Sequence, residues 1–258
     1  MGNLKNSYVT LIFLFFYCPL GVLILFSFND TTYSALWQGF TWRWYALLLN
    51  DHTLIQVTTH SLILSLLAST IATAIGTYTS VALFRFRFAG KRFLEGLLFT
   101  LIMLPDIVVG ISLLLLFSFI HLKTGFLTLL LAHITFCIPF AVVTIYSRIT
   151  GMDKHLFEAA KDLGANDFTI LTKIVIPLLL PAIVASWLLS FTLSIDDVII
   201  SFFVSGPQFQ ILPLQIYSMI RLGITPEINA LCSIIFAITL LLVTLAAFML
   251  RKKPGRPA

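Results

Sequence analysis

Charged residues are scarce in this 258-residue sequence. Asp, Glu, Lys and Arg make up 10% of the chain, whereas a soluble domain has about 25%. Hydrophobic residues reach 59%, and a soluble fold of this size cannot hide so much apolar surface. The shortage of charge therefore excludes an ordinary soluble protein. It predicts a single membrane-embedded domain over residues 1–258, whose apolar faces are solvated by lipid.

Signatures of metal, nucleotide and catalytic sites are also missing. Cys18, Cys137 and Cys232 lie in apolar runs without paired or metal-ligand spacing, so we expect them to be small apolar side chains and expect no metal site. No G-x-x-x-x-G-K-[ST] loop occurs, so the chain is predicted to bind no ATP or other cofactor itself. No nucleophile–base pair lies at a common membrane depth, which argues against an enzyme.

Six apolar stretches are long enough to cross a bilayer core, which takes about 20 helical residues. Helix is the required form, because a lone lipid-exposed strand leaves backbone groups unsatisfied. The segment 202–227 is too polar to span and too apolar for a plain loop, and it predicts short interfacial or re-entrant helices. The predicted spans are 8–28, 61–84, 97–121, 126–147, 178–201 and 228–250.

The basic residues predict the orientation. If the N-terminus lies in the cytoplasm, 13 of the 16 Lys and Arg residues fall on the cytoplasmic side, and only Arg43, Lys123 and Arg221 fall outside. Such a bias sets topology, so both termini are predicted to be cytoplasmic. The net charge of +5 is then a topology signal, and nucleic-acid binding is not expected.

The predicted cytoplasmic loop 148–177 carries the most specific motif. Leu156, Phe157, Ala160 and Leu163 predict an apolar stripe on a short helix, and Gly164 is placed to end that helix in a left-handed turn. An exposed apolar surface of this kind needs a partner to cover it. The motif consists of Glu158, Ala159, Ala160, Gly164, Ile174 and Pro177.

This spacing resembles the EAA signature of permeases from binding-protein-dependent ABC importers, with Ile176 where that pattern has Leu. The resemblance implies an all-α membrane protein with six transmembrane helices and the type I ABC importer permease (MetI-like) fold. It also implies a separate cytoplasmic ATPase that receives the short helix in a groove and supplies the ATP hydrolysis. The loop taken alone also fits a self-packed elbow.

Three carboxylates fall within or beside predicted spans: Asp106, Asp196 and Asp197. A charge at a helix centre costs about 2.5–3.5 kcal/mol, so such residues usually mark a pathway, a gate or an ion pair. No basic residue lies in the six spans to neutralise them. Acids lining a water-filled path favour a cationic cargo, and Phe202 and Tyr217 are candidates for cation–π contacts.

A structural interpretation of the acids stays open. Adjacent residues point about 100° apart on a helix, so Asp196 and Asp197 do not both face one cavity. One of them would then cap a helix end or bond a neighbouring hydroxyl. Asp106 follows Pro105 and is equally suited to the restart of a kinked helix. His133, inside the fourth span, fits either a lining residue or a hydrogen bond between helices.

The runs FRFRFAGK, LPDIVVGISLL, LSFTLSIDDVIISFFVSGP and ILPLQIYSMI resemble permeases of the spermidine/putrescine importer family. This resemblance implies polyamine import across the bacterial inner membrane, with this chain forming half of the channel. It also implies three kinds of partner: a related second permease, paired ATP-binding subunits and a periplasmic binding protein. The residues by themselves leave open an ABC permease for another small solute and an ion-coupled carrier.

Two exposed segments have competing interpretations. The aromatic residues of 37–45 fit a dock for a binding protein or an aromatic belt at the outer interface. The basic run 85–92 fits recognition of anionic lipid or a simple topology anchor.

Overall fold

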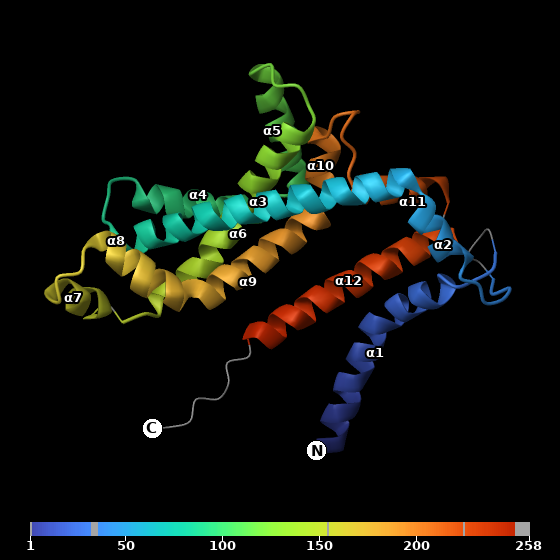
Figure 1. Cartoon of the computed structure of the whole chain (residues 1–258), viewed down its shortest axis with the longest axis horizontal. Coiled ribbons are helices and arrows are strands. Elements are labelled where there is room, and N and C mark those ends of the chain that lie inside the picture. Colours follow the sequence, from blue (N-terminus) through green and yellow to red (C-terminus); the bar gives the residue numbers. More distant parts are fainter. Residues whose placement is uncertain (1, 32–35, 154, 224, 251–258) are drawn as a thin grey trace. The chain divides into compact units, whose positions relative to one another are not determined.

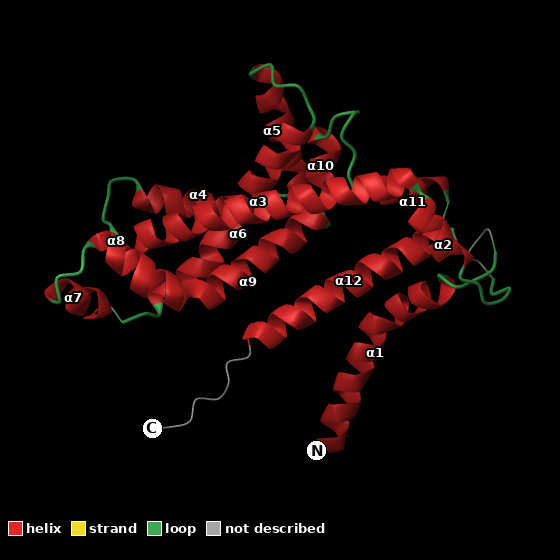
Figure 2. Cartoon of the chain, in the orientation of Figure 1, coloured by secondary structure: helices red, strands yellow, loops and turns green. Residues whose placement is uncertain are grey.

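The computed structural model describes residues 2–31, 36–153, 155–223 and 225–250. Within these ranges the chain is helical, and its only β-type pairings are two isolated bridges, Asn29–Phe40 and Gly206–Phe209 (Figure 2). The predicted all-α fold is confirmed. The chain divides into two compact units: Met1–Gln56 with Gln215–Ala258 (unit 1), and Val57–Leu214 (unit 2).

Unit 1 joins the two ends of the chain. In this unit α12 packs against both α1 and α2 (Figure 1). Asn29 fixes the connection after α1: its side chain donates to Leu36 O (2.7 Å) and accepts from Gln38 N (2.8 Å), while its carbonyl accepts from Trp44 Nε1 (2.8 Å). The helices are α1 (Gly2–Phe26), α2 (Arg43–Asn50), the start of α3 (His52–Arg85), most of α11 (Leu212–Leu222) and α12 (Pro226–Leu250).

Unit 2 contains both candidate sites. Its largest helix contacts are α6 on α9 and α5 on α10, the latter visible side by side in Figure 1. Besides most of α3, its helices are α4 (Lys91–Met103), α5 (Asp106–Phe119), α6 (Phe126–Thr150), α7 (His155–Asp162), α8 (Asp167–Ile170), the π-turn η1 (Leu171–Val175), α9 (Ile176–Ile195) and α10 (Ile199–Val204).

Small residues allow the helices of unit 2 to approach closely. A Cβ on Gly76 of α3 would lie 2.7 Å from the Cβ of Ala141 on α6, so only glycine fits this crossing. One turn later Ser80 Oγ donates to Val142 O of α6 at 3.0 Å. Apolar attraction between helices is weak in lipid, so close packing and interhelical hydrogen bonds hold such pairs together.

The predicted span 97–121 was wrong as a single helix. Its two parts are α4, which ends at Met103, and α5, which begins at Asp106, and they meet at 113°. The cause lies in Pro105, which lacks an N–H and forces the preceding residue into extended backbone. Leu104 has φ −70° and ψ 137°. Asp106 is therefore the first residue of a helix and not the middle of one.

The predicted span 178–201 was shifted. A continuous helical run extends from Asp167 to Ile195 through the π-turn. The helix then ends at Asp196, before α10 begins. Four helices among the described residues are long and apolar enough to cross a membrane, or five if the bent α4–α5 pair counts as one span. The predicted total of six spans stays a prediction.

Candidate functional site

The first half of the EAA loop (residues 148–177) is the short helix α7, which has one packed and one exposed face. Ala160 is buried in the same apolar cluster as Ile145 and Ile149 of α6. Phe157 packs beside Phe84 of α3, with ring centroids 5.7 Å apart. Glu158 is exposed, and its ion pair within the described residues is with His155, at 3.3 Å. One face of α7 is therefore anchored to the helix ends, and the other is open.

Gly164 ends α7 as predicted. Its φ is +80°, a left-handed conformation that side chains disfavour. Its N–H donates to Lys161 O at 2.8 Å, and the N–H of Ala165 donates to Ala160 O at 3.0 Å. These two bonds form a Schellman motif, which satisfies carbonyls at the end of the helix and reverses the chain.

The second half of the EAA loop continues into α9 without an interruption of the helical structure. Asn166 caps α8 by accepting from Thr169 N at 2.8 Å, and Asp167 forms an ion pair with Arg85 at the end of α3. Ile174 packs against the buried cluster from within the π-turn. Pro177 lies in the first turn of α9. Because Pro177 has no N–H to donate, a locally wider π-turn just before it is expected.

The predicted apolar stripe on α7 was wrong at Leu163. Helix α7 ends at Asp162, so this residue falls in the turn, where it is 89% exposed. Phe168 on α8 is 74% exposed. Both side chains are therefore exposed apolar groups of the EAA loop.

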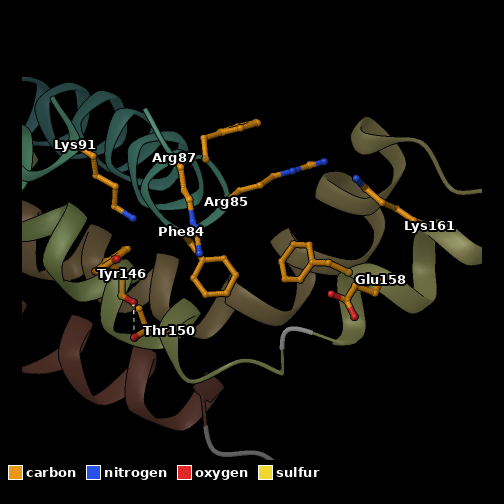
Figure 3. A pocket seen from close by; sticks show the side chains of 10 residues that line it. Phe84, Arg85, Arg87, Lys91, Tyr146, Thr150, Glu158 and Lys161 are labelled. Atoms are coloured by element: carbon orange, nitrogen blue, oxygen red, sulfur yellow. Dashed lines mark hydrogen bonds between the residues drawn. The ribbon is translucent and has the colours of Figure 1, made fainter. Parts of the chain in front are cut away.

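A cavity of about 590 Å³ lies beside α7, between the ends of α3 and α6 (Figure 3). Its wall combines aromatic and basic side chains. The lining residues are Phe84, Arg85, Phe86, Arg87, Lys91, Tyr146, Thr150, Phe157, Glu158 and Lys161.

The break between α9 and α10 places two adjacent acids in opposite environments. Asp197 is 8% exposed, and its carboxylate accepts from Ile200 N (3.2 Å), Ser201 N (2.8 Å) and Ser201 Oγ (2.7 Å). These bonds satisfy the first N–H groups of α10, so the helix-capping interpretation describes what Asp197 does here. Asp196 ends α9 and is exposed.

His133 connects three helices beside this buried acid. Its side chain is 1% exposed, with Nδ1 2.7 Å from Ser194 Oγ on α9 and Nε2 2.9 Å from Ser201 Oγ on α10. The Ser201 hydroxyl donates its one proton to the Asp197 carboxylate, so its oxygen accepts from His133. Nε2 therefore carries a proton. The prediction of a hydrogen bond between helices is confirmed for this residue.

Asp106 lies within electrostatic range of both acids at the break. Its helix α5 is held on α10 by a close contact, because a Cβ on Gly110 would lie 2.8 Å from Phe203 Cδ2 and 3.3 Å from Ile200 Cα. Among the described residues, neither Asp106 nor Asp196 forms an ion pair with Lys or Arg. The structure thus brings together three acids, and no Lys or Arg among the described residues forms an ion pair with any of them.

The two predicted aromatic contacts lie in different units. Phe202 belongs to unit 2, where it is 58% exposed on α10 and packs edge-on against Phe203. Tyr217 belongs to unit 1, where the Arg221 guanidinium lies 4.6 Å from its ring centroid and donates to its hydroxyl. The ring of Tyr217 is therefore already engaged by a cation of its own chain.

Sequence reasoning missed a set of buried hydroxyls on α3 and α9. Ser194 Oγ donates to Ser65 Oγ at 3.3 Å, and three other hydroxyls, of Thr73, Ser186 and Ser190, have no partner within the described chain. The four-residue spacing of Ser and Thr along both helices was the available signal. The buried members are Ser61, Ser65, Ser69, Thr73, Thr77, Ser80, Ser186, Ser190 and Ser194.

Known proteins match this chain over most of its length. The family described as "Binding-protein-dependent transport system inner membrane component" matches residues 70–253. The spermidine/putrescine transport system permease protein PotC of Escherichia coli (strain K12) is 50% identical over 97% of this chain and 95% of that protein. Its counterpart in Haemophilus influenzae is 49% identical over 96% and 97%. The E. coli putrescine transport system permease protein PotI is 40% identical over 86% and 82%.

Solved structures of ABC transporters share the fold. A chain of a bacterial ABC transporter involved in the import of alginate superposes with a TM-score of 0.75 at 17% identity, over 97% of this chain and 96% of that one. A chain of the MetNI methionine ABC transporter gives a TM-score of 0.62 at 15% identity, over 76% and 91%. The predicted permease fold is thereby confirmed. This chain belongs to the family of inner membrane components of binding-protein-dependent transport systems, and it is a transport component rather than an enzyme.

Proposed function

We propose that this chain is the permease subunit of an ATP-driven importer of polyamines such as spermidine and putrescine. The observation that carries the cargo assignment is that Asp106 and Asp196, beside the break between α9 and α10, form no ion pair with Lys or Arg among the described residues. Polyamines are flexible polycations, and carboxylates on a water-filled path attract them. The 50% identity to a permease whose name states spermidine and putrescine supports the same cargo.

Within this proposal the three acids have different tasks. Asp106 and Asp196 face the cargo, and Asp197 holds the first turn of α10 in place through its backbone contacts. Phe202 adds an exposed ring beside the path, where a cation–π contact contributes about 0.5–2 kcal/mol. Tyr217 contacts the cargo only if the Arg221 guanidinium moves away from the Tyr217 ring.

The proposal also includes the assembly. The chain spans the inner membrane six times as a single domain, with both termini in the cytoplasm, and forms half of a channel with a related second permease. A periplasmic binding protein delivers the cargo. Paired ATP-binding subunits receive α7 and the exposed Leu163 and Phe168, and Glu158, Ala159 and Gly164 shape that contact. The chain itself binds no cofactor, and ATP is hydrolysed by its partners.

Uptake of labelled spermidine tests the cargo. Asp106→Asn and Asp196→Asn remove one charge each and keep the side-chain volume, so we expect each to raise KM about tenfold, equivalent to about 1.4 kcal/mol. Glu95→Gln on α4 is the matched control, since this acid lies outside both candidate sites and its 3.9 Å approach to Lys91 is a weak pair. Normal uptake by both Asn variants would refute the polyamine assignment and leave the importer class intact.

A further inference from the structure

The cavity beside α7 has an excess of positive charge. Four cationic side chains line it, namely Arg85, Arg87, Lys91 and Lys161, against one carboxylate, Glu158. A second, smaller hollow of about 410 Å³ shares Arg87 and Lys91, which extends the basic surface along the connection between α3 and α4.

Three of these cations already have a partner among the described residues, and Arg87 does not. Arg85 pairs with Asp167, and Lys91 Nζ donates to Leu83 O at 2.6 Å. Lys161 forms a long ion pair with the exposed Asp167 at 4.0 Å, whereas Arg87 has no ion pair or hydrogen bond with any described residue. Figure 3 shows Arg87 and Lys161 on different elements of the fold, with the Arg85 side chain between them. An anion in the cavity would meet cationic side chains from both elements.

The remaining wall suits an apolar group attached to that anion. Phe84, Tyr146 and Phe157 line it, and the neighbouring Phe86 is 54% exposed. A free inorganic anion gains little from such a wall, because burial of apolar surface requires an apolar partner. The cavity volume of about 590 Å³ is within the range of small-molecule sites.

The position of the cavity along the helices favours a lipid. Helices α3 and α6 are candidate membrane spans, and they end at Arg85 and Thr150, which both line the cavity. A site at the end of two spanning helices lies where hydrocarbon gives way to water, which is the level of phospholipid headgroups. Basic clusters next to a span bind anionic lipids.

We propose that this cavity binds an anionic phospholipid such as phosphatidylglycerol. Its phosphate lies between Arg87 and Lys161, and its glycerol and upper acyl chains lie against Phe84, Tyr146 and Phe157. Such a lipid joins the α3–α4 connection to α7 and steadies the EAA loop. That consequence for coupling rests on the proposed function, whereas the binding site itself does not.

Native mass spectrometry of the purified chain, titrated with phosphatidylglycerol against a phosphatidylcholine background, tests the site. Each cation near a membrane surface contributes about fivefold in affinity, so Arg87→Gln with Lys161→Gln should weaken binding about 30-fold. Arg148→Gln with Lys173→Gln is the matched control, since both residues are exposed and neither lines the cavity. We expect less than about threefold from the control, because charges outside the cavity are screened from the bound headgroup by water and salt. Equal weakening by both pairs would mean diffuse surface attraction and would refute the site.

A second arm separates a lipid from a free phosphate. Phe157→Ala should weaken phosphatidylglycerol binding by removing part of the apolar wall, and inorganic phosphate should compete poorly with the lipid. If inorganic phosphate displaces the lipid fully and Phe157→Ala has no effect, the lipid assignment is wrong. The titration contains no polyamine and no ATPase, so its outcome is independent of the uptake experiment.

Discussion

Acid–base pairs occur both at the break between α9 and α10 and in the EAA loop. They are buried at the break and exposed in the loop. At the break, the side chains of His133 and Asp197 are 1% and 5% exposed, and the groups around them form one connected set of hydrogen bonds. In the EAA loop, the side chains of Glu158 and Asp167 are 74% and 64% exposed. Buried polar groups are costly to leave unpaired, whereas water replaces the partner of an exposed one. The stability of the fold should therefore depend on the charged side chains at the break between α9 and α10. In the EAA loop it should depend on the backbone conformation.

Asp197→Ala tests the buried side of this contrast and should have the largest effect. It leaves two N–H groups of α10 and the Ser201 hydroxyl without an acceptor, and it removes the partner of His133. We expect a loss of about 3 kcal/mol in the free energy of unfolding, measured by chemical unfolding in detergent micelles.

Asp196→Ala is the control, because it removes the same group one residue earlier. Asp196 is exposed, so its stability should stay within about 0.5 kcal/mol of the unsubstituted chain, while polyamine uptake falls. Equal destabilisation by both substitutions would contradict the assignment of separate tasks to the two acids.

Gly164→Ala tests the backbone of the EAA loop and should have an intermediate effect. The φ of +80° strains any side chain, although no atom lies within 4 Å of the added Cβ. We expect a cost of about 1–2 kcal/mol, seen as faster hydrogen exchange across α7 and α8.

Gly151→Ala provides the matched control for Gly164. At Gly151 φ is −85°, and a Cβ would make an ordinary contact of 3.6 Å with Arg148 O. Exchange across α7 and α8 should be unchanged in this variant. Equal acceleration in both variants would show that the left-handed turn is not what fixes α7.

Arg85→Gln should have the smallest effect on folding. It removes the ion pair between α3 and Asp167, but that carboxylate is mostly in water. The unfolding temperature in neutral detergent should stay within about 1 °C of the unsubstituted value. A larger drop would show that the exposed pair anchors α8, and it would weaken the contrast between the two regions.

Local sequence signals predicted the EAA loop better than the acid site. The Gly164 turn follows from one residue and its neighbours, and the observed Schellman bonds run over six consecutive residues. The acid site instead depends on how α5, α6, α9 and α10 meet. Pro105 indicated that the predicted third span is interrupted. The 113° bend and the contact at Gly110, however, depend on packing.

The sequence by itself determined the membrane character, the helical class, the EAA spacing and the presence of acids without basic neighbours. These follow from composition and from the fixed geometry of a helix. Only the tertiary structure decided that Asp197 is buried while Asp196 is exposed, that His133 reaches both α9 and α10, and that Arg87 and Lys161 share a cavity. The reason is that the sequence does not fix how each helix is rotated about its own axis. Lipid accepts any face of an apolar helix, so contacts with neighbouring helices choose which side chains turn inward.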